Sequence, residues 1–456
     1  MTTTLVLFIL LLYGTGMYLI GRRARRRASG FQDVIAAPGQ TSLLLLAGSA
    51  VGGQIGSGFV MGGAEYGARF GIAGAWYGIG CGLSYFVTAC LAQFIREKQM
   101  VSLSDYFAQR YHGRATRLIY SVTGIFSCIA LLAGQLLAAR AIFRTLYLPA
   151  QWGVVLTAMV ALLYTNVAGL WGSMAASSLQ SAIIFVGMVT ALAAVLSGVG
   201  PQVLTEQMPE DCFQIIPSDR EFWLSTAAPI VLAGPVNQIA FQSVSSAKSV
   251  RVAQGGYLLA GLLLIPAAFI PPVLGMFGRS LFPQLSADQA FTALLLNRLP
   301  TIVAAVILAA VICAVIASCN SAYIAVATNS IHDIYQGMIN PEADSRTCKH
   351  LMLAVDLVVC GLGILLALKM NDIIRVLSMG YSLMAAGCLV PFLGGALWKR
   401  GSSAGALASA AAGMAACLAD SLGPIHLPYA SITCVLIALA AYMSVSLLVP
   451  EPTATE

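Results

Sequence analysis

Among the carboxamide side chains that lie in otherwise apolar stretches of the sequence, we single out Gln54, Gln135 and the adjacent pair Asn237 and Gln238. A carboxamide can donate and accept hydrogen bonds without carrying charge, and a polar group removed from water needs a partner. Gln54 and the Asn237, Gln238 pair are therefore our first candidates to bind a small polar molecule. Gln135 is the next candidate, although a hydrogen bond to a neighbouring helix accounts for it equally well.

Several aromatic residues lie close to these amides in the sequence. In apolar helices such residues usually pack or anchor a helix at an interface, and only a minority line a binding site. Those that could line or gate a site are Tyr77 and Phe241, followed by Phe59, Trp76 and Tyr85.

The sequence contains no recognisable catalytic grouping. Its four histidines fall in or beside polar loops, and no Ser/His/Asp set, phosphate-binding loop or paired-carboxylate site is evident. The eleven cysteines lack the spacing of a zinc site. We therefore expect a protein that is not an enzyme.

Asp356 is the one carboxylate that hydropathy puts well inside an apolar stretch. A charge at the centre of a bilayer costs at least about 2.5 to 3.5 kcal/mol, so this side chain should face water, have a partner or be protonated. Arg346 and Lys349 precede it closely in the sequence, which favours a structural ion pair. A proton relay is the alternative.

The overall composition excludes a soluble globular protein. The chain has 456 residues, of which 59% are hydrophobic and 9% charged, against roughly a quarter charged in an ordinary soluble domain. The net charge is +6, but the basic residues lie beside apolar segments, which indicates a membrane-orientation signal rather than nucleic-acid binding. We expect an all-α protein surrounded by a lipid bilayer, with no nucleic-acid partner.

The apolar stretches are long enough for thirteen transmembrane helices, since one span needs about 20 mostly apolar residues. The predicted spans are 3–20, 41–67, 70–95, 117–143, 150–171, 176–199, 223–246, 252–276, 301–328, 351–369, 374–397, 402–420 and 428–449. The whole chain then forms one transmembrane domain.

The basic residues also predict an orientation. Five arginines between Arg22 and Arg27 follow the first span, and no charge precedes it, which is the reverse of a signal peptide. By the positive-inside rule, the N-terminus lies outside and the C-terminus in the cytoplasm. This orientation also puts most of the 24 basic residues in cytoplasmic loops.

Two of the predicted spans contain strong helix breakers. The span at 41–67 carries a dense run of glycines from Gly52 to Gly63, and the span at 223–246 carries Pro235 beside Asn237. Each interrupted span begins a run of five, at 41–199 and 223–397, so the second run is inverted relative to the first. Discontinuous helices in corresponding places of two inverted repeats are typical of secondary transporters, whose binding site lies between them. The spans at 3–20 and 402–449 are additional to the repeats.

Four segments resemble the solute/sodium symporter family. They are SLSDYFAQRYHGRATR (103–118), the amide-rich segment from Asn237 to Lys248, ATNSIHDIY (327–335) and PFLGGALWKRGSSAGALASAAAG (391–413). Their order on thirteen spans strengthens the resemblance, which covers most of the chain. It implies a LeuT-type fold and sodium-driven uptake of a small solute across a cell membrane, here most simply a bacterial inner membrane.

The resemblance also implies a sodium site between the second and ninth spans. Carried over position by position, the backbone ligands are Gly52, Ile55 and Ala314, and a hydroxyl ligand is Ser318. Neutral oxygens suit a hard cation without placing a fixed charge in lipid. Without the resemblance, Ser318 would be interpreted as a hydroxyl bonded to a carbonyl one turn earlier.

The sequence departs from the family pattern at two positions. Ala317 replaces a second hydroxyl, and Ser177 stands where family members carry an acidic residue three positions before a glutamine. Water, Ser57 or Ser321 could supply the missing oxygen. The expected function is sodium-coupled symport of a small polar or anionic organic solute. The alternatives are a sodium-independent or proton-coupled transporter of the same fold, and a transporter-like sensor that signals through a protein partner, although no obligate partner is evident.

Overall fold

The computed structural model describes residues 41–98, 100–217, 219–421, 423 and 425–450, together with isolated positions before residue 41. The side chains of residues 166–169 are also not described. The predicted span at 3–20 falls partly, and the arginine cluster after it wholly, outside the described residues.

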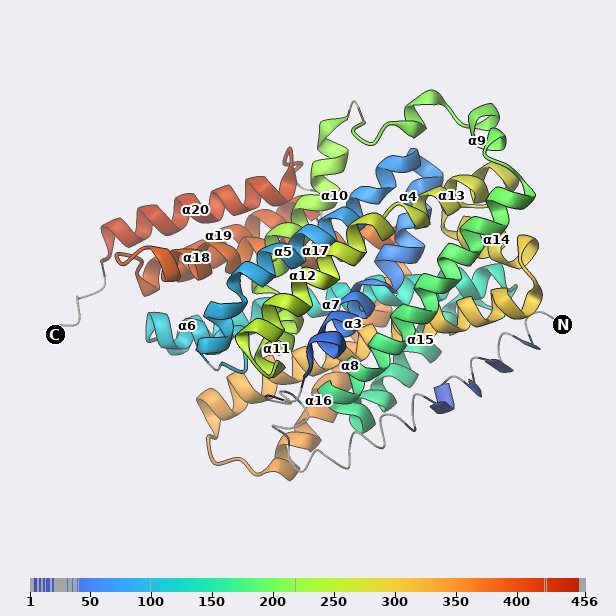
Figure 1. The fold of residues 1–456 in the computed structure, drawn as a ribbon. Helices are drawn as coiled ribbons and strands as arrows, with labels where there is room; N and C mark the ends of the chain where they lie inside the picture. Colours follow the sequence, from blue (N-terminus) through green and yellow to red (C-terminus); the bar gives the residue numbers. More distant parts are fainter. Residues whose placement is uncertain are drawn as a thin grey trace.

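The described chain is helical almost throughout (Figure 1). Among its residues, nine helical segments are long and apolar enough to cross a membrane, and a tenth is added when the bent pair Arg220–Val236 and Gln238–Ser246 is taken as one span. The α-helices are α3 (Leu43–Gln54), α4 (Gly63–Phe70), α5 (Trp76–Glu97), α6 (Leu103–Tyr111), α7 (Arg114–Thr145), α8 (Ala150–Gly198), α9 (Gln202–Gln207), α10 (Arg220–Ala233), α11 (Gln238–Ser246), α12 (Val250–Ala267), α13 (Ile270–Leu281), α14 (Ala290–Arg298), α15 (Thr301–Ala327), α16 (Ser345–Lys369), α17 (Ile373–Met384), α18 (Val390–Leu397), α19 (Ser403–Ser421) and α20 (Ala430–Leu448). Two π-helical segments matter below, η1 (Ser57–Gly62) and η6 (Thr328–Ile339).

Most predicted spans coincide with one or two helices, and one boundary differs. The spans predicted at 150–171 and 176–199 share the helical element α8, with no loop between them. Residues 172–175 contain no proline, and their single glycine costs a helix only about 1 kcal/mol relative to alanine, so the sequence there has no strong stop signal.

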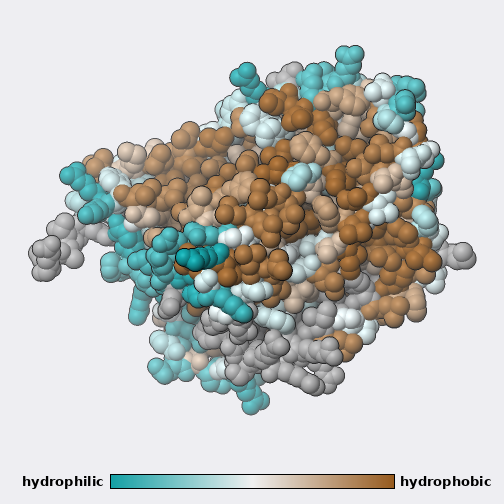
Figure 2. Space-filling view, in the orientation of Figure 1, coloured by the Kyte–Doolittle hydropathy of each residue, from teal (hydrophilic) through white to brown (hydrophobic). Residues whose placement is uncertain are grey.

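The helices pack around α15, which is buried along nearly all of its length and contacts α7 and α8. By contrast, α16 and α20 expose large apolar side chains such as Leu357, Leu365, Leu436 and Leu447. Figure 2 shows apolar residues across the middle of the molecule and polar residues toward its extremities. This distribution is expected of a multi-pass membrane protein whose surface faces lipid.

Both predicted helix interruptions are confirmed. The first helix stops after Gln54, and the chain passes through Ile55 and Gly56 before η1 and α4 continue. The second stops after Ala233 and passes through a short 3₁₀ turn at Gly234–Val236, and its two halves meet at 44°. Pro235 explains this second break because it lacks a backbone donor and clashes with the preceding turn.

Candidate functional site

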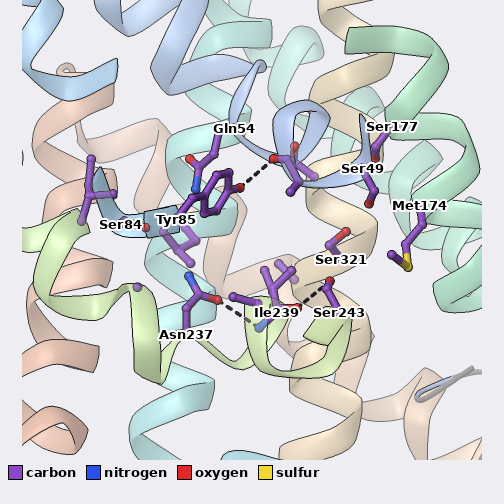
Figure 3. A pocket seen from close by; sticks show the side chains of 18 of the residues that line it. Ser49, Gln54, Ser84, Tyr85, Met174, Ser177, Asn237, Ile239, Ser243 and Ser321 are labelled. Atoms are coloured by element: carbon purple, nitrogen blue, oxygen red, sulfur yellow. Dashed lines mark hydrogen bonds between the residues drawn. The ribbon is translucent and has the colours of Figure 1, made fainter. Parts of the chain in front are cut away.

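A cavity lies between the two interrupted helices (Figure 3). Its polar lining consists of amides and hydroxyls, and none of the residues that line it is Asp, Glu, Lys, Arg or His. The polar residues that line it are Ser49, Gln54, Ser84, Tyr85, Gln135, Ser177, Asn237, Ser243, Tyr257, Ser318, Ser321 and Tyr381. Three of the four amides predicted from the sequence, Gln54, Gln135 and Asn237, are therefore brought together.

The first break frees backbone oxygens beside this cavity. The amide of Gly56 donates to Gln54 O at 2.8 Å, rather than to Gly52 O four residues back. The carbonyl of Gly52 consequently lacks its ordinary helical donor. Gly52 also lies against α8 so closely that a Cβ there would collide with the carbonyl of Ser177.

Three further oxygens surround the bare Cα of Gly56. A Cβ on this residue would lie 3.4 Å from Gln135 Oε1, 3.5 Å from Ser318 Oγ and 4.0 Å from Ala314 O. Ser57 Oγ donates to Gln135 Oε1 at 2.7 Å. Oxygens from α7 and α15 thus converge on the same break.

Ser318 has no hydrogen-bond partner among the described residues, although its side chain is only 8% exposed. The bond to a carbonyl one turn earlier, which its position in a helix favours, is therefore not formed. Ser321 does form such a bond, to Ala317 O at 3.2 Å. An unpartnered buried hydroxyl is costly. The lone pairs of the Ser318 hydroxyl oxygen are therefore suited to coordinate a cation.

At the second break, a side chain of the break itself accepts a hydrogen bond from the backbone. Asn237 Oδ1 accepts from Ile239 N at 2.9 Å and so caps α11. Figure 3 shows the amide nitrogen of Asn237 on the cavity side of this cap. Gln54 faces the same space from α3, where its Oε1 accepts from Cys81 Sγ at 3.4 Å and Tyr381 Oη at 3.5 Å.

Comparison with known proteins agrees with this arrangement. The model of the Sodium:solute symporter family matches residues 35–413, which is most of the chain. The chain belongs to the sodium:solute symporter family. This symporter is 23% identical to the sodium/pantothenate symporter of Haemophilus influenzae, over 70% of this chain and 68% of the relative. It is 24% identical to the sodium/myo-inositol cotransporter 2 of Oryctolagus cuniculus, over 88% and 67%.

Solved structures define the fold of the symporter. A Na⁺-coupled sialic acid symporter in its substrate-bound outward-open state matches with a TM-score of 0.84 and 16% identity, over 99% of each chain. MhsT in complex with L-phenylalanine matches with a TM-score of 0.58 and 13% identity, over 90% of this chain and 99% of that one. The symporter therefore has a LeuT-type fold. It is a transporter rather than an enzyme, and sodium is its coupling ion.

Three of the predicted solute-site residues do not line the cavity of the symporter. Gln238 Oε1 accepts from Leu103 N at 3.0 Å, which ties α11 to α6. Phe241 is 1% exposed and Tyr77 is 2% exposed, and both belong to the packed interior. Tyr77 lies directly against Gly58, where a Cβ would collide with its hydroxyl.

The structure does not support an ion pair for Asp356. In the described part of the chain neither carboxylate oxygen has a hydrogen-bond partner and no basic side chain lies within salt-bridge distance, although the residue is fully buried. Tyr323 and Cys360 are two titratable side chains close enough to interact with it. The expected pairing with Arg346 or Lys349 is wrong because both precede Asp356 on the same helix, α16, by about 15 and 10 Å along its axis, at about 1.5 Å per residue.

A polar network that was not predicted from the sequence joins α6 to η6. Asp105 accepts from Arg117 at 3.0 Å and lies 3.2 Å from His332 Nε2, while Ser102 donates to Asp333 at 2.6 Å. Burial opposes the charged form of Asp105, but His332 and Arg117 outweigh it and hold the pKa of this carboxyl below its usual range. The capping pattern of Ser102 with Asp105 three residues later was the available signal.

Proposed function

We propose that the symporter imports a small polar organic solute with sodium, by alternating access around the cavity between the two interrupted helices. Residues 41–199 and 223–397 form the two inverted repeats of five spans, and the segments at 3–20 and 402–449 add further spans to make thirteen. The N-terminus lies outside and the C-terminus in the cytoplasm of a bacterial inner membrane. The observation that carries this proposal is the charge-free, amide-lined cavity reached by both helix breaks.

The solute contacts are Gln54, Asn237 and the amide nitrogen of Gln135. Amides and hydroxyls can match the donors and acceptors of a hydroxyl-rich molecule, and no fixed charge in the lining would compensate a charged one. Relatives of the chain include symporters of pantothenate and myo-inositol, and a structural neighbour carries sialic acid. All three molecules carry hydroxyl groups, and pantothenate and sialic acid also carry a carboxylate. A neutral polyol or sugar fits this lining best, and an anion fits if bound sodium balances its charge.

The coupling sodium binds beside the first break, at the carbonyls of Gly52, Ile55 and Ala314 and the hydroxyl of Ser318. Support comes from the redirected hydrogen bond of Gly56 and from the unpartnered hydroxyl of Ser318. A hard cation prefers several neutral oxygens of this kind inside a membrane protein. Next to the solute, its charge would favour polar and anionic groups.

The proposal is tested by thermal unfolding of the purified symporter with myo-inositol, glucose, pantothenate and sialic acid, each in NaCl and in KCl of equal ionic strength. A native-state ligand raises the unfolding temperature. We expect stabilisation by a polyol or sugar that depends on sodium, and sodium-driven uptake of that solute into proteoliposomes. Asn237→Ala should remove the solute-dependent shift and leave the sodium-dependent shift. Retention of the solute shift in this variant would mean that the solute binds elsewhere.

A further inference from the structure

The sodium site proposed above lacks one hydroxyl, because Ala317 stands beside Ser318 where a second hydroxyl is expected. Both serines considered as a replacement already have hydrogen-bond partners. Ser321 Oγ donates to Ala317 O at 3.2 Å and lies 3.2 Å from Ser173 Oγ. Ser57 Oγ is the donor in its 2.7 Å contact with Gln135 Oε1. Apart from the chain neighbours of Gly56, the side-chain oxygens nearest to the position of a Cβ on Gly56 are those of Gln135 and Ser318.

The orientation of the Gln135 amide follows from its contacts. Its Oε1 lies 3.4 Å from Ser57 N and 2.7 Å from Ser57 Oγ. A backbone N–H can only donate, so the atom facing it must be the amide oxygen rather than the nitrogen. Oε1 therefore points at the break, and Nε2 is left for the cavity that Gln135 also lines.

This oxygen shares one space with the proposed sodium ligands. The point where a Cβ of Gly56 would lie is 3.4 Å from Gln135 Oε1, 3.5 Å from Ser318 Oγ and 4.0 Å from Ala314 O. Because Gly56 has no side chain, nothing of its own fills this space. Both side-chain oxygens are neutral, which suits a cation site in a membrane interior.

We propose that Gln135 is a ligand of the coupling sodium, taking the place of the hydroxyl that Ala317 lacks. This inference rests on the sodium site proposed above. One amide then serves both bound species, with Oε1 on sodium and Nε2 toward the solute. Sodium binding fixes the orientation of the amide and so presents its donor to the solute, which links the two binding events.

The experiment uses sodium alone as the probe. Purified variants are titrated with NaCl in place of KCl at constant ionic strength, and the midpoint of the rise in unfolding temperature gives the apparent sodium affinity. Gln135→Ala should weaken that affinity about tenfold or more, as expected for losing one bond to a charged species. Gln135→Ala combined with Ala317→Ser should recover at least about half of the loss on a logarithmic scale, because the hydroxyl is restored.

Two controls separate this inference from the sodium site on which it rests. Gln242→Ala removes another buried glutamine, whose Nε2 donates to Thr328 Oγ1 at 2.7 Å, and should leave sodium affinity unchanged even where it lowers stability.

Ser318→Ala tests the site itself. An unchanged affinity in Ser318→Ala would overturn the site. A second outcome is that Ser318→Ala weakens the sodium affinity, while Gln135→Ala does not or Ala317→Ser restores none of its loss. That outcome would keep the site and overturn only the assignment of Gln135. Should Gln135→Ala fail to fold, Gln135→Met replaces it, because methionine keeps the length of the side chain without the amide oxygen. A sodium affinity about tenfold weaker in Gln135→Met supports the assignment, and an unchanged affinity overturns it.

Discussion

The first interrupted helix breaks at Ile55 and Gly56 and the second at Gly234–Asn237, and the two breaks present different atoms to one cavity. The first is rich in glycine, and its redirected hydrogen bond leaves a carbonyl without its helical donor. The second contains Pro235 and is capped by the side chain of Asn237, so its backbone is better satisfied and an amide nitrogen faces the cavity. A glycine break therefore offers acceptors, which suit a cation, whereas an asparagine-capped break offers a donor, which suits a solute.

Filling the space at Gly56 should have the largest effect on this comparison. Gly56→Ala places a methyl group 3.4 to 4.0 Å from the three oxygens, which is ordinary contact distance, so the protein should still fold. The methyl group would occupy the space assigned to sodium. We expect the sodium-dependent rise in unfolding temperature to disappear, as measured in NaCl against KCl. A wild-type sodium response in this variant would show that the glycine break is not the cation site.

The second break is tested by Asn237→Ser, which keeps an oxygen for the helix cap but removes the amide nitrogen. Loss of an N-cap costs about 0.5 to 2 kcal/mol, so Asn237→Ala should be less stable than Asn237→Ser. Both variants should lose at least about tenfold in affinity for the solute found by thermal-shift screening, as expected for leaving one polar group unpaired. Sodium affinity should be unchanged in both. If Asn237→Ser kept full affinity for the solute, Asn237 would cap α11 without contacting the solute.

The two breaks also differ in how much of them the sequence could reveal. The glycine run at 52–63 and Pro235 announce both interruptions, because each acts through the local backbone. The local sequence does not show that Gln238 and Phe241 lie outside the cavity, or that Tyr381 lines it. Asn237 is the cap of α11 with an extended backbone, whereas Gln238 is the first residue of the helix, and only one of the two lines the cavity. Which one does so depends on how α11 packs against α6, and this is a tertiary contact.

Gln238 holds α11, the second half of the second interrupted helix, against α6. Gln238→Ala would leave Leu103 N buried without an acceptor, at a cost of about 1 to 3 kcal/mol. We expect a lower unfolding temperature and unchanged sodium affinity, measured in the same titration. Gln238→Met keeps the length of the side chain without the acceptor oxygen and is the matched variant, expected to lose the same hydrogen bond. If Gln238→Ala lost as much solute affinity as Asn237→Ala, Gln238 would be a solute contact after all.

Asp356 should give the smallest effect, because it belongs to neither break and has no partner among the described residues. Removing one member of a buried ion pair costs about 3 to 5 kcal/mol, whereas Asp356→Asn removes no pair and should change stability by less than about 1 kcal/mol. Asp105→Asn is the contrasting variant, because Asp105 does contact Arg117 and His332 and should lose more. Both are measured by thermal unfolding in NaCl and in KCl. If Asp356→Asn instead abolished the sodium-dependent shift, the cation would bind at α16, and the division between a cation-binding break and a solute-binding break would fail.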